Sequence, residues 1–294
     1  MPRPDVSAIV IVYNGAAFLE EAAASILAQT FTDYELLIVD DGSTDGTPAI
    51  AERLRRENPD RIAVLRHPDG ANLGMSASRN LGITHAKGEF IAFLDSDDAW
   101  SPTKLAEQAE AMRRHPLAGL VYGRALIWRS WQDGESDFYY DLGVEPDRLY
   151  EPPQLFLRQL RNVDQTPTTS GSMLRRSLVE KVGGFEPSFR AMFEDQVFFA
   201  KALLAAPAYV SGATWFRYRQ HPGSATATSA ACGADEQARI RYLEWLAGYL
   251  QAAGDRQLEQ SAVRSALRQA RRAPFQRRIA RVRRRLARSW PLSR

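Results

Sequence analysis

The sequence predicts an α/β fold in which a mostly parallel sheet is covered by helices on both faces. Apolar runs alternate with helical stretches through the first half of the chain, as in repeated β-α units. Two of these runs end in acidic clusters, Asp40-Asp41 and Asp95-Ser96-Asp97-Asp98. Open α/β sheets bind ligands at the carboxyl ends of their strands, so a site is expected there.

The elements alternate regularly from the amino terminus. Strands are expected at residues 7–13, 35–39, 62–66, 90–94, 119–127 and 214–218, where short apolar runs are bounded by turn residues. Helices are expected at residues 16–28, 47–58, 76–84, 102–115, 154–160, 196–205 and 236–253, with another ending near 270. Ser101 and Pro102 look like the N-cap and first residue of their helix. A break is expected at Ala273-Pro274.

Asp95 and Asp97 follow a buried strand and point to the same side of an extended chain. Two such charges repel unless a cation or hydrogen-bond donors neutralise them. Carboxylate oxygens suit Mg²⁺ or Mn²⁺, with substrate phosphates completing the coordination. The alternative is a polar turn that caps the next helix, which explains Ser101 and Pro102 but not three acids before them.

The pair Asp40-Asp41 could accept hydrogen bonds from a nucleotide base or a ribose hydroxyl. The alternative is a turn in which Gly42 adopts positive φ and Thr44 or Asp45 caps a helix. The sequence contains neither Gly-x-Gly-x-x-Gly after the first strand nor Gly-x-x-x-x-Gly-Lys-Ser/Thr. These absences argue against dinucleotide dehydrogenases and P-loop NTPases.

Short motifs follow one another along roughly residues 5–225. They are Val10-Ile11-Val12-Tyr13-Asn14, Ser25-Ile26-Leu27-Ala28-Gln29-Thr30, Val39-Asp40-Asp41-Gly42-Ser43-Thr44-Asp45, Gly74-Met75-Ser76-Ala77-Ser78-Arg79-Asn80-Leu81-Gly82, Asp95-Ser96-Asp97-Asp98, Gly183-Gly184-Phe185, Glu194-Asp195 and Tyr218-Arg219-Gln220-His221-Pro222-Gly223-Ser224. With these motifs in this order, the chain resembles family 2 inverting glycosyltransferases.

The resemblance implies a GT-A fold, a UDP-sugar or other nucleotide-sugar donor, and Mn²⁺ or Mg²⁺ as cofactor. It implies that Asp195 is the general base and that Asp97, Asp95 and His221 hold the metal. The residues expected to bind the donor are Tyr13, Asp41, Arg79, Asp95, Arg219 and His221. The Gln-x-x-Arg-Trp motif of processive members is missing, which favours transfer of a single sugar to a glycan or lipid-linked acceptor in cell-surface polysaccharide synthesis.

Each of these assignments has a structural alternative. Arg79 could be a surface residue, Glu194-Asp195 the start of a helix, and His221 a loop residue with a local hydrogen bond. A non-catalytic nucleotide-sugar binder and a related nucleotidyltransferase are the alternative functions. The nucleotidyltransferase would need a Gly-rich phosphate loop after the first strand, which residues 13–17 lack.

An aromatic stretch interrupts the α/β alternation after the strand at 119–127. It contains Trp128, Trp131, Phe138, Tyr139 and Tyr140 with acidic residues between them. Such rings can stack on acceptor sugars, but they more often pack a long loop onto the body, which is the interpretation we favour. The loop 166–170 is expected on the acceptor side.

The length and composition of the 294 residues suit one large domain plus an appendage. The resemblance implies that the large domain, 1–229, is a GT-A glycosyltransferase domain, followed by a helical extension, 230–294. Residues 264–294 hold twelve arginines and no acid, whereas the first 263 residues hold 26 basic and 35 acidic side chains, a net charge of −9. Within 274–290, the apolar residues Phe275, Ile279, Val282, Leu286 and Trp290 recur at helical spacing. This basic amphipathic segment favours an anionic membrane surface, with docking on the acidic body as the alternative.

The single cysteine, Cys232, rules out an internal disulfide and fits a reducing compartment. No apolar run is long enough to span a membrane. The sequence therefore predicts a cytoplasmic protein held peripherally at the inner face of the cell membrane. Nucleic acid is not an expected partner, because no reading motif accompanies the arginines.

Overall fold

The computed structural model describes residues 3–132, 134–161, 164–190, 192–224, 227–228 and 235–288, of which 235 and 273–288 are described by their backbone alone. The chain forms two compact units, residues 1–228 and 229–294. The first unit contains the sheet, and the second contains the helices α9 and α10. No helix in the described ranges is both long and apolar enough to cross a membrane.

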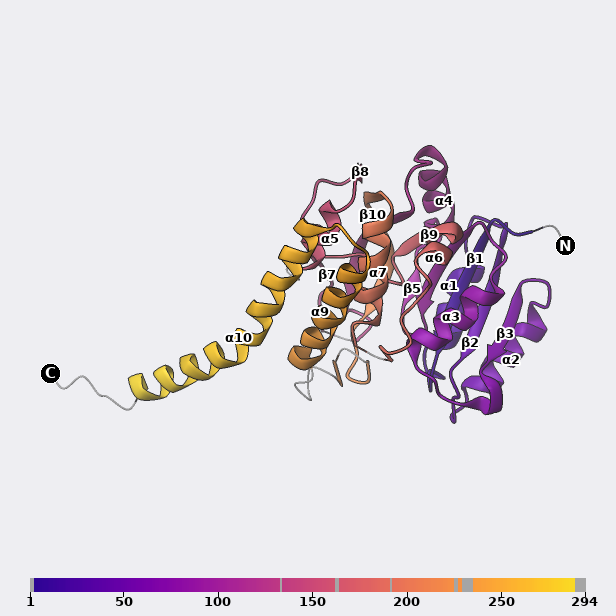
Figure 1. Ribbon diagram of the computed structural model, residues 1–294. Coiled ribbons are helices and arrows are strands. Elements are labelled where there is room, and N and C mark those ends of the chain that lie inside the picture. Colours follow the sequence, from indigo (N-terminus) through magenta and orange to yellow (C-terminus); the bar gives the residue numbers. More distant parts are fainter. Residues whose placement is uncertain are drawn as a thin grey trace. The chain divides into compact units, whose positions relative to one another are not determined.

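The first unit alternates strands and helices along most of its length (Figure 1). The strands are β1 Val6–Val12, β2 Tyr34–Asp40, β3 Ile62–Arg66, β4 Phe90–Asp95, β5 Ala99–Trp100, β6 Leu120–Trp128, β7 Phe138–Tyr139, β8 Arg148–Tyr150, β9 Ser172–Arg175 and β10 Ala208–Arg219. The α-helices are α1 Leu19–Leu27, α2 Thr47–Glu57, α3 Met75–His85, α4 Lys104–Arg114, α5 Gln154–Gln159, α6 Arg176–Lys181 and α7 Glu194–Ala205.

The first four long strands form the parallel half of the sheet, in the order β3-β2-β1-β4. Parallel neighbours joined by helices are what the β-α alternation predicted, and Figure 1 shows β1, β2 and β3 side by side. The α/β expectation is confirmed in this half, where both acidic clusters lie at strand ends.

The second half of the sheet is mixed, which the sequence did not predict. Strand β9 runs antiparallel to both β4 and β6, while β6 and β10 are parallel. The short strands β5, β7 and β8 pair antiparallel at its margins. Strands β5, β7, β8 and β9 contain between two and four residues, too few to give a periodic signal.

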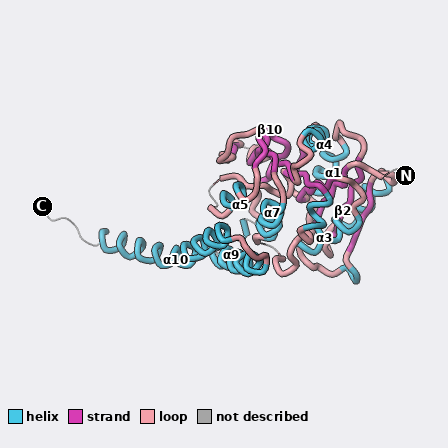
Figure 2. Tube along the Cα trace, turned by 45° about the horizontal axis from the view of Figure 1, so that its top comes forward, coloured by secondary structure: helices cyan, strands magenta, loops and turns pink. Residues whose placement is uncertain are grey.

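Helices cover both faces of this sheet, as Figure 2 shows for α1 and α4 on one side and α3 on the other. Leu19 and Ile26 of α1 are buried in one core with Val10 of β1 and Leu105 of α4. On the opposite face Phe93 of β4 packs edge-on against Phe185 and Phe198, with ring centroids 5.4 and 6.3 Å away. These two cores fix the strand ends from which the site is built.

The predicted N-cap at Ser101 and the predicted helix start at Pro102 are wrong. Helix α4 begins at Lys104 after an N-cap at Thr103, because Ala99–Trp100 pairs with β10 and the N–H of Ser101 donates to the carbonyl of Trp215. The chain is therefore still paired to the sheet where a cap was expected.

In the second unit, α9 spans Asp235–Ala252 and α10 spans Gln257–Arg288. Helix α10 continues through Pro274, where a break was predicted. Proline removes one backbone donor and bends a helix, but the hydrogen bonds on either side can preserve it, and α10 is curved in Figure 1.

Candidate functional site

Parallel neighbours bring the two acidic clusters to the same edge of the sheet. Val12 pairs with Asp40 and Ile11 pairs with Asp95, so β1, β2 and β4 end together. The N–H of Asp41 also donates to the carbonyl oxygen of Val12 at 2.9 Å. This is the edge at which the sequence predicted a site.

Asp41 is buried and its carboxylate holds the loop that leads into α3. It accepts hydrogen bonds from the N–H groups of Leu73, at 2.8 Å to Oδ1, and Gly74, at 2.9 Å to Oδ2. Gly74 has φ +90°, and a Cβ there would lie 2.9 Å from the carbonyl oxygen of Arg190, so glycine is required. These bonds orient Asp41, whose contact with a nucleotide base stays a prediction.

Tyr13 follows β1 and is 53% exposed at this edge. The next residue, Asn14, ties its turn to the turn after β2. Its side-chain oxygen accepts from the N–H of Thr44 at 2.8 Å, and its own N–H donates to Ser43 Oγ at 2.9 Å. Tyr13 is thus an accessible ring on an anchored turn.

The three acids at and after the end of β4, Asp95, Asp97 and Asp98, have different surroundings. Asp98 is buried, and its two oxygens accept from the hydroxyl of Ser170 at 2.6 Å and the N–H of Arg219 at 2.9 Å. Burial raises its pKa well above the ordinary value, with Asp97 and Asp95 raising it further. Burial and then Asp95 also raise the pKa of Asp97, although His221 lowers it. The concentration of negative charge suits a bound cation.

Asp95 is oriented by two further side chains. Its Oδ1 accepts from Arg79 at 2.7 Å, and its Oδ2 accepts from the hydroxyl of Thr169 at 2.8 Å. Arg79 is 1% exposed and also donates to Glu194 Oε1 at 2.9 Å. Burial lowers the pKa of Arg79, but the two carboxylates outweigh burial and raise it overall. Arg79 is therefore a buried cation between two acids, not a surface residue.

Glu194 and Asp195 form the first turn of α7. Phe193, before them, has a left-handed backbone with φ 66°, which is rare for a bulky residue. Burial, and then Asp195, raise the pKa of Glu194 to about 7. Burial also raises the pKa of Asp195, opposed by Arg79 and by the N–H of Gln196, which donates to Asp195 Oδ1 at 2.7 Å. A raised pKa brings a carboxylate closer to the range in which general bases work at neutral pH.

Arg219 and His221, at and just after the end of β10, both contact the turn at residues 95–98 (the acid turn). Arg219 is 4% exposed, and its Nε donates to the carbonyl oxygen of Asp97 at 2.7 Å. His221 Nε2 lies 3.0 Å from Asp97 Oδ2, and its ring packs against Phe18. The predicted donor contacts of Arg219 and His221, and the metal contact of His221, stay predictions.

Asp95 and Asp97 supply hard oxygen ligands of the kind that Mg²⁺ and Mn²⁺ prefer. Across the described ranges, no group of three His, Cys, Asp or Glu side chains is arranged to hold a metal ion. Two carboxylates that share an ion with a substrate diphosphate need no third side chain. The residues present therefore fit a divalent cation that is shared with a substrate diphosphate.

The aromatic stretch divides into a packed part and an exposed part. Trp131 packs edge-on against Phe18 and donates from Nε1 to the carbonyl oxygen of Gln220 at 3.0 Å. Tyr139 and Tyr140, by contrast, are 51 and 53% exposed. Packing of the loop therefore explains Trp131 but not the two tyrosines.

Sequence reasoning missed the hydroxyls of Thr169 and Ser170 as partners of Asp95 and Asp98. It placed their loop on the acceptor side without assigning these contacts. The two residues lie more than 70 positions from the acids in the chain, and only the pairing of β9 with β4 brings their loop to the acid turn. No sequence motif could have indicated the contact.

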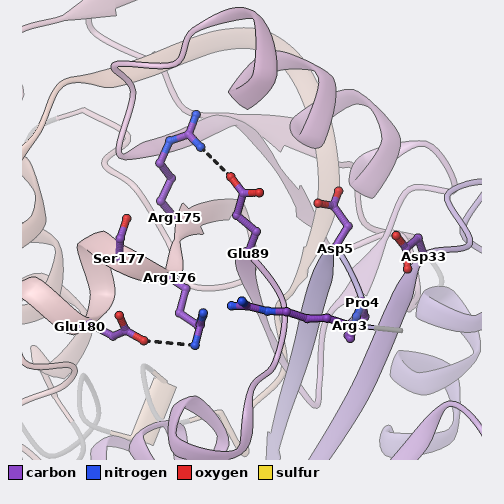
Figure 3. Close-up of a pocket in the computed structure, with 9 residues that line it drawn as sticks. All are labelled: Arg3, Pro4, Asp5, Asp33, Glu89, Arg175, Arg176, Ser177 and Glu180. Carbon is purple, nitrogen blue, oxygen red and sulfur yellow. Dashed lines mark hydrogen bonds and ion pairs between the residues drawn. The ribbon is translucent and has the colours of Figure 1, made fainter. Parts of the chain in front are cut away.

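A polar hollow of about 450 Å³ lies at the amino-terminal side of the parallel strands (Figure 3). Arg175 pairs there with Glu89 at 3.1 Å, and Arg176 pairs with Glu180 at 3.3 Å. The hollow is at the edge opposite Asp41 and Asp95. We therefore assign it no part in the candidate site.

Comparison with known proteins identifies related sequences. The family model described as Glycosyl transferase family 2 matches residues 7–183. An uncharacterized glycosyltransferase of Nostoc sp. is 35% identical over 62% of this chain and 54% of its own length. The succinoglycan biosynthesis protein ExoW of Rhizobium meliloti is 33% identical over 67% of this chain and 63% of its own length. The putative teichuronic acid biosynthesis glycosyltransferase TuaG of Bacillus subtilis is 37% identical over 42% of this chain and 48% of its own length. The chain spans about half to two thirds of the length of these relatives.

Solved structures share the fold at lower sequence identity. S. aureus TarS 1-349 in complex with UDP-GlcNAc has a TM-score of 0.69 and 22% identity, covering 90% of this chain and 70% of that one. The mannosyltransferase PcManGT from Pyrobaculum calidifontis, in complex with GDP-Man and Mn2+, has a TM-score of 0.60 and 19% identity, covering 92% and 76%. The GT-A fold predicted from the sequence is confirmed.

Proposed function

The chain belongs to glycosyl transferase family 2, and on that premise we propose that it transfers a single sugar from a nucleotide-sugar donor to an acceptor hydroxyl with inversion at the anomeric carbon. The proposed donor is a UDP-sugar. The proposed acceptor is a glycan or lipid-linked glycan of a cell-surface polysaccharide.

One observation carries the proposal. Arg79 bonds both Asp95, in the acid turn, and Glu194, beside Asp195. The proposed metal-binding acid Asp95 is thus linked through buried Arg79 to Glu194, the neighbour of the candidate base Asp195. A helix start without a catalytic role would not require that connection.

In the proposed reaction, Asp195 accepts the proton of the acceptor hydroxyl while the oxygen of that hydroxyl bonds to the anomeric carbon. The bond from that carbon to the donor phosphate oxygen breaks at the same time, and the electron pair leaves with the nucleoside diphosphate. Displacement from the opposite side inverts the configuration. General-base assistance of this kind contributes typically about 10²–10⁴-fold to the rate.

Tyr13 and Asp41 are the proposed contacts of the nucleoside, while Arg79, Arg219 and His221 are the basic side chains around the acid turn. Asp95 and Asp97, together with His221, would hold Mn²⁺ or Mg²⁺. Such an ion offsets the negative charge that develops on the departing diphosphate. The cation in the PcManGT structure and the UDP-GlcNAc in the TarS structure support this choice of ligands.

The names of ExoW and TuaG support an acceptor in polysaccharide synthesis. We further propose that residues 264–294 hold the protein at an anionic membrane surface on its cytoplasmic side, where lipid-linked acceptors lie. The support is the run of twelve arginines without an acid, together with the helix α10 that continues to Arg288.

The product distinguishes this function from its alternatives. Purified protein is incubated with a panel of nucleotide sugars, Mn²⁺ and candidate glycan acceptors, and the released nucleotide is identified. Nucleoside diphosphate released in proportion to glycosylated product is the expected result. Pyrophosphate would indicate a nucleotidyltransferase, and binding without release under every condition would indicate a non-catalytic binder.

A further inference from the structure

The guanidinium of Arg219 is enclosed by three aromatic rings from two segments of the chain, one just before α1 and one at and after the end of β6. Its central carbon lies 4.1 Å from the ring centroid of Trp128, 4.9 Å from that of Trp131 and 5.1 Å from that of Phe18. One terminal nitrogen pairs with Glu21 of α1. Cations are attracted to aromatic faces, so this enclosure compensates part of the loss of water around a buried charge.

The same residue attaches the end of β10 to the acid turn. Its Nε donates to the carbonyl oxygen of Asp97 at 2.7 Å, and its backbone N–H donates to Asp98 Oδ1 at 2.9 Å. Arg219 therefore fixes the main chain of Asp97 without bonding to its carboxylate. Trp131 also donates to the carbonyl oxygen of Gln220, so the residue after Arg219 is anchored as well.

These contacts leave little of the guanidinium for a substrate. Its Nε and one terminal nitrogen are used within the protein, and the residue is only 4% exposed. Glu21 is half exposed, with 50% of its side chain accessible, so the pair lies at the boundary between the enclosure and solvent. To reach a donor diphosphate, the guanidinium would have to leave the rings and the carbonyl of Asp97.

We propose that Arg219 is a positioning residue that sets the main chain of Asp97 for cation binding, and that Glu21 holds Arg219 in place. This inference rests on the proposed function, because it concerns the metal site of the same reaction. Partners just outside a set of metal ligands orient those ligands, and their loss typically weakens metal affinity by about 10- to 100-fold.

The test measures Mn²⁺ binding by electron paramagnetic resonance and UDP binding by calorimetry, each with the other ligand absent and present. The variants are Arg219→Lys and Glu21→Gln, and the matched control is Arg217→Lys. Arg217 lies two residues away on the same strand, and its guanidinium carbon is 5.3 Å from the ring centroid of Trp128. Among the contacts of the described residues, no side-chain hydrogen bond or ion pair joins Arg217 to the acid turn. Thermal unfolding checks that each variant is folded.

We expect Glu21→Gln and Arg219→Lys to weaken Mn²⁺ binding by about 10-fold or more, while Arg217→Lys binds like the wild type. If Arg219 contacted the diphosphate instead, Arg219→Lys would weaken UDP binding alone, and Glu21→Gln would strengthen it by removing a negative charge. That pattern would overturn the inference, as would wild-type Mn²⁺ affinity in Glu21→Gln. Should Arg219→Lys fail to fold, the Glu21→Gln result decides. If the wild type binds neither Mn²⁺ nor UDP, the proposed function fails as well.

Discussion

Asp95 and Glu194 bond to opposite nitrogens of one buried guanidinium. Arg79 donates to the first at 2.7 Å and to the second at 2.9 Å. Because Asp95 ends β4 and Glu194 begins α7, the pair connects the proposed metal site to the helix that carries the proposed base. The proposed reaction centre is thus a network across three elements, β4, α3 and α7, and its parts can be tested separately.

Replacing Asp195 by asparagine should abolish most turnover and leave donor binding nearly intact. The loss should be about 10²–10⁴-fold in kcat, because a general base acts on the acceptor proton and not on the bound donor. Steady-state kinetics and UDP calorimetry measure the two effects. The NMR spectrum of the wild-type product should show the anomeric configuration opposite to that of the donor, and retention would contradict a single displacement.

Replacing Asp97 by asparagine should remove most activity without unfolding the protein. A neutral amide is a poorer ligand for a divalent cation, whereas the N–H and carbonyl groups of residue 97 are unchanged. Excess EDTA should stop the wild-type enzyme, and added Mn²⁺ or Mg²⁺ should restore it. Full turnover in EDTA, or an active Asp97→Asn enzyme, would exclude the assignment.

The stability of the first unit should depend on pH through Glu194. Its pKa rises to about 7 from an ordinary value of 4.5. The contribution of Glu194 to the free energy of unfolding is therefore fully present below about pH 4.5 and is lost as pH rises through 7. Glu194→Gln cannot ionise. Urea unfolding without metal should therefore show the variant gaining stability relative to the wild type between about pH 5 and 8, by at most about 1.4 kcal/mol per pH unit. If the stabilities of the wild type and of Glu194→Gln changed equally with pH, the raised pKa of Glu194 would be contradicted.

The parallel half of the fold could be predicted because its signals are local. Each of β1 to β4 is an apolar run, and the acids Asp41 and Asp95 lie directly at strand ends. The antiparallel strand β9 could not be predicted, since four residues carry no period. Its pairing decides which hydroxyls reach the acids.

The candidate site likewise has residues with local sequence signals and partners that only long-range packing brings together. Asp41, Asp95, Asp97 and Asp195 could be proposed as site residues from short motifs. The partners that orient them could not, because the pairing of Arg79 with Glu194 spans 115 positions and that of Arg219 with Glu21 spans 198. Long-range pairs depend on how strands and helices pack, which single residues do not encode.

Removing the hydroxyl of Ser170 should destabilise the acid turn. Ser170 is 1% exposed and donates to the buried carboxylate of Asp98 at 2.6 Å, so Ser170→Ala leaves that oxygen without its donor. The expected cost is about 1–3 kcal/mol in the free energy of unfolding. Ser177→Ala, at an exposed position, is the control and should be neutral. Equal stability of the two variants would contradict this account of Asp98.

The basic end of α10 should bind anionic membranes. Cutting the chain after Arg272 removes residues 273–294 with eight arginines, while it keeps the bond of Arg271 to Glu244 at 2.7 Å between α10 and α9. Each basic residue near an anionic surface contributes about 1 kcal/mol, so the full-length chain should float with vesicles that contain anionic lipid. The attraction should weaken with salt, since the Debye length falls from about 10 Å at 0.1 M to about 3 Å at 1 M.

The truncated chain should not float, but it should keep donor binding and turnover on a small water-soluble acceptor, because every proposed catalytic residue precedes position 225. Activity on a lipid-linked acceptor should fall more, since the enzyme would no longer be concentrated at its substrate. A full-length variant with Arg277, Arg278 and Arg281 changed to glutamine separates charge from helix length and should float less. If the full-length and truncated chains float equally, or neither floats, the membrane proposal fails, and docking on the acidic first unit takes its place.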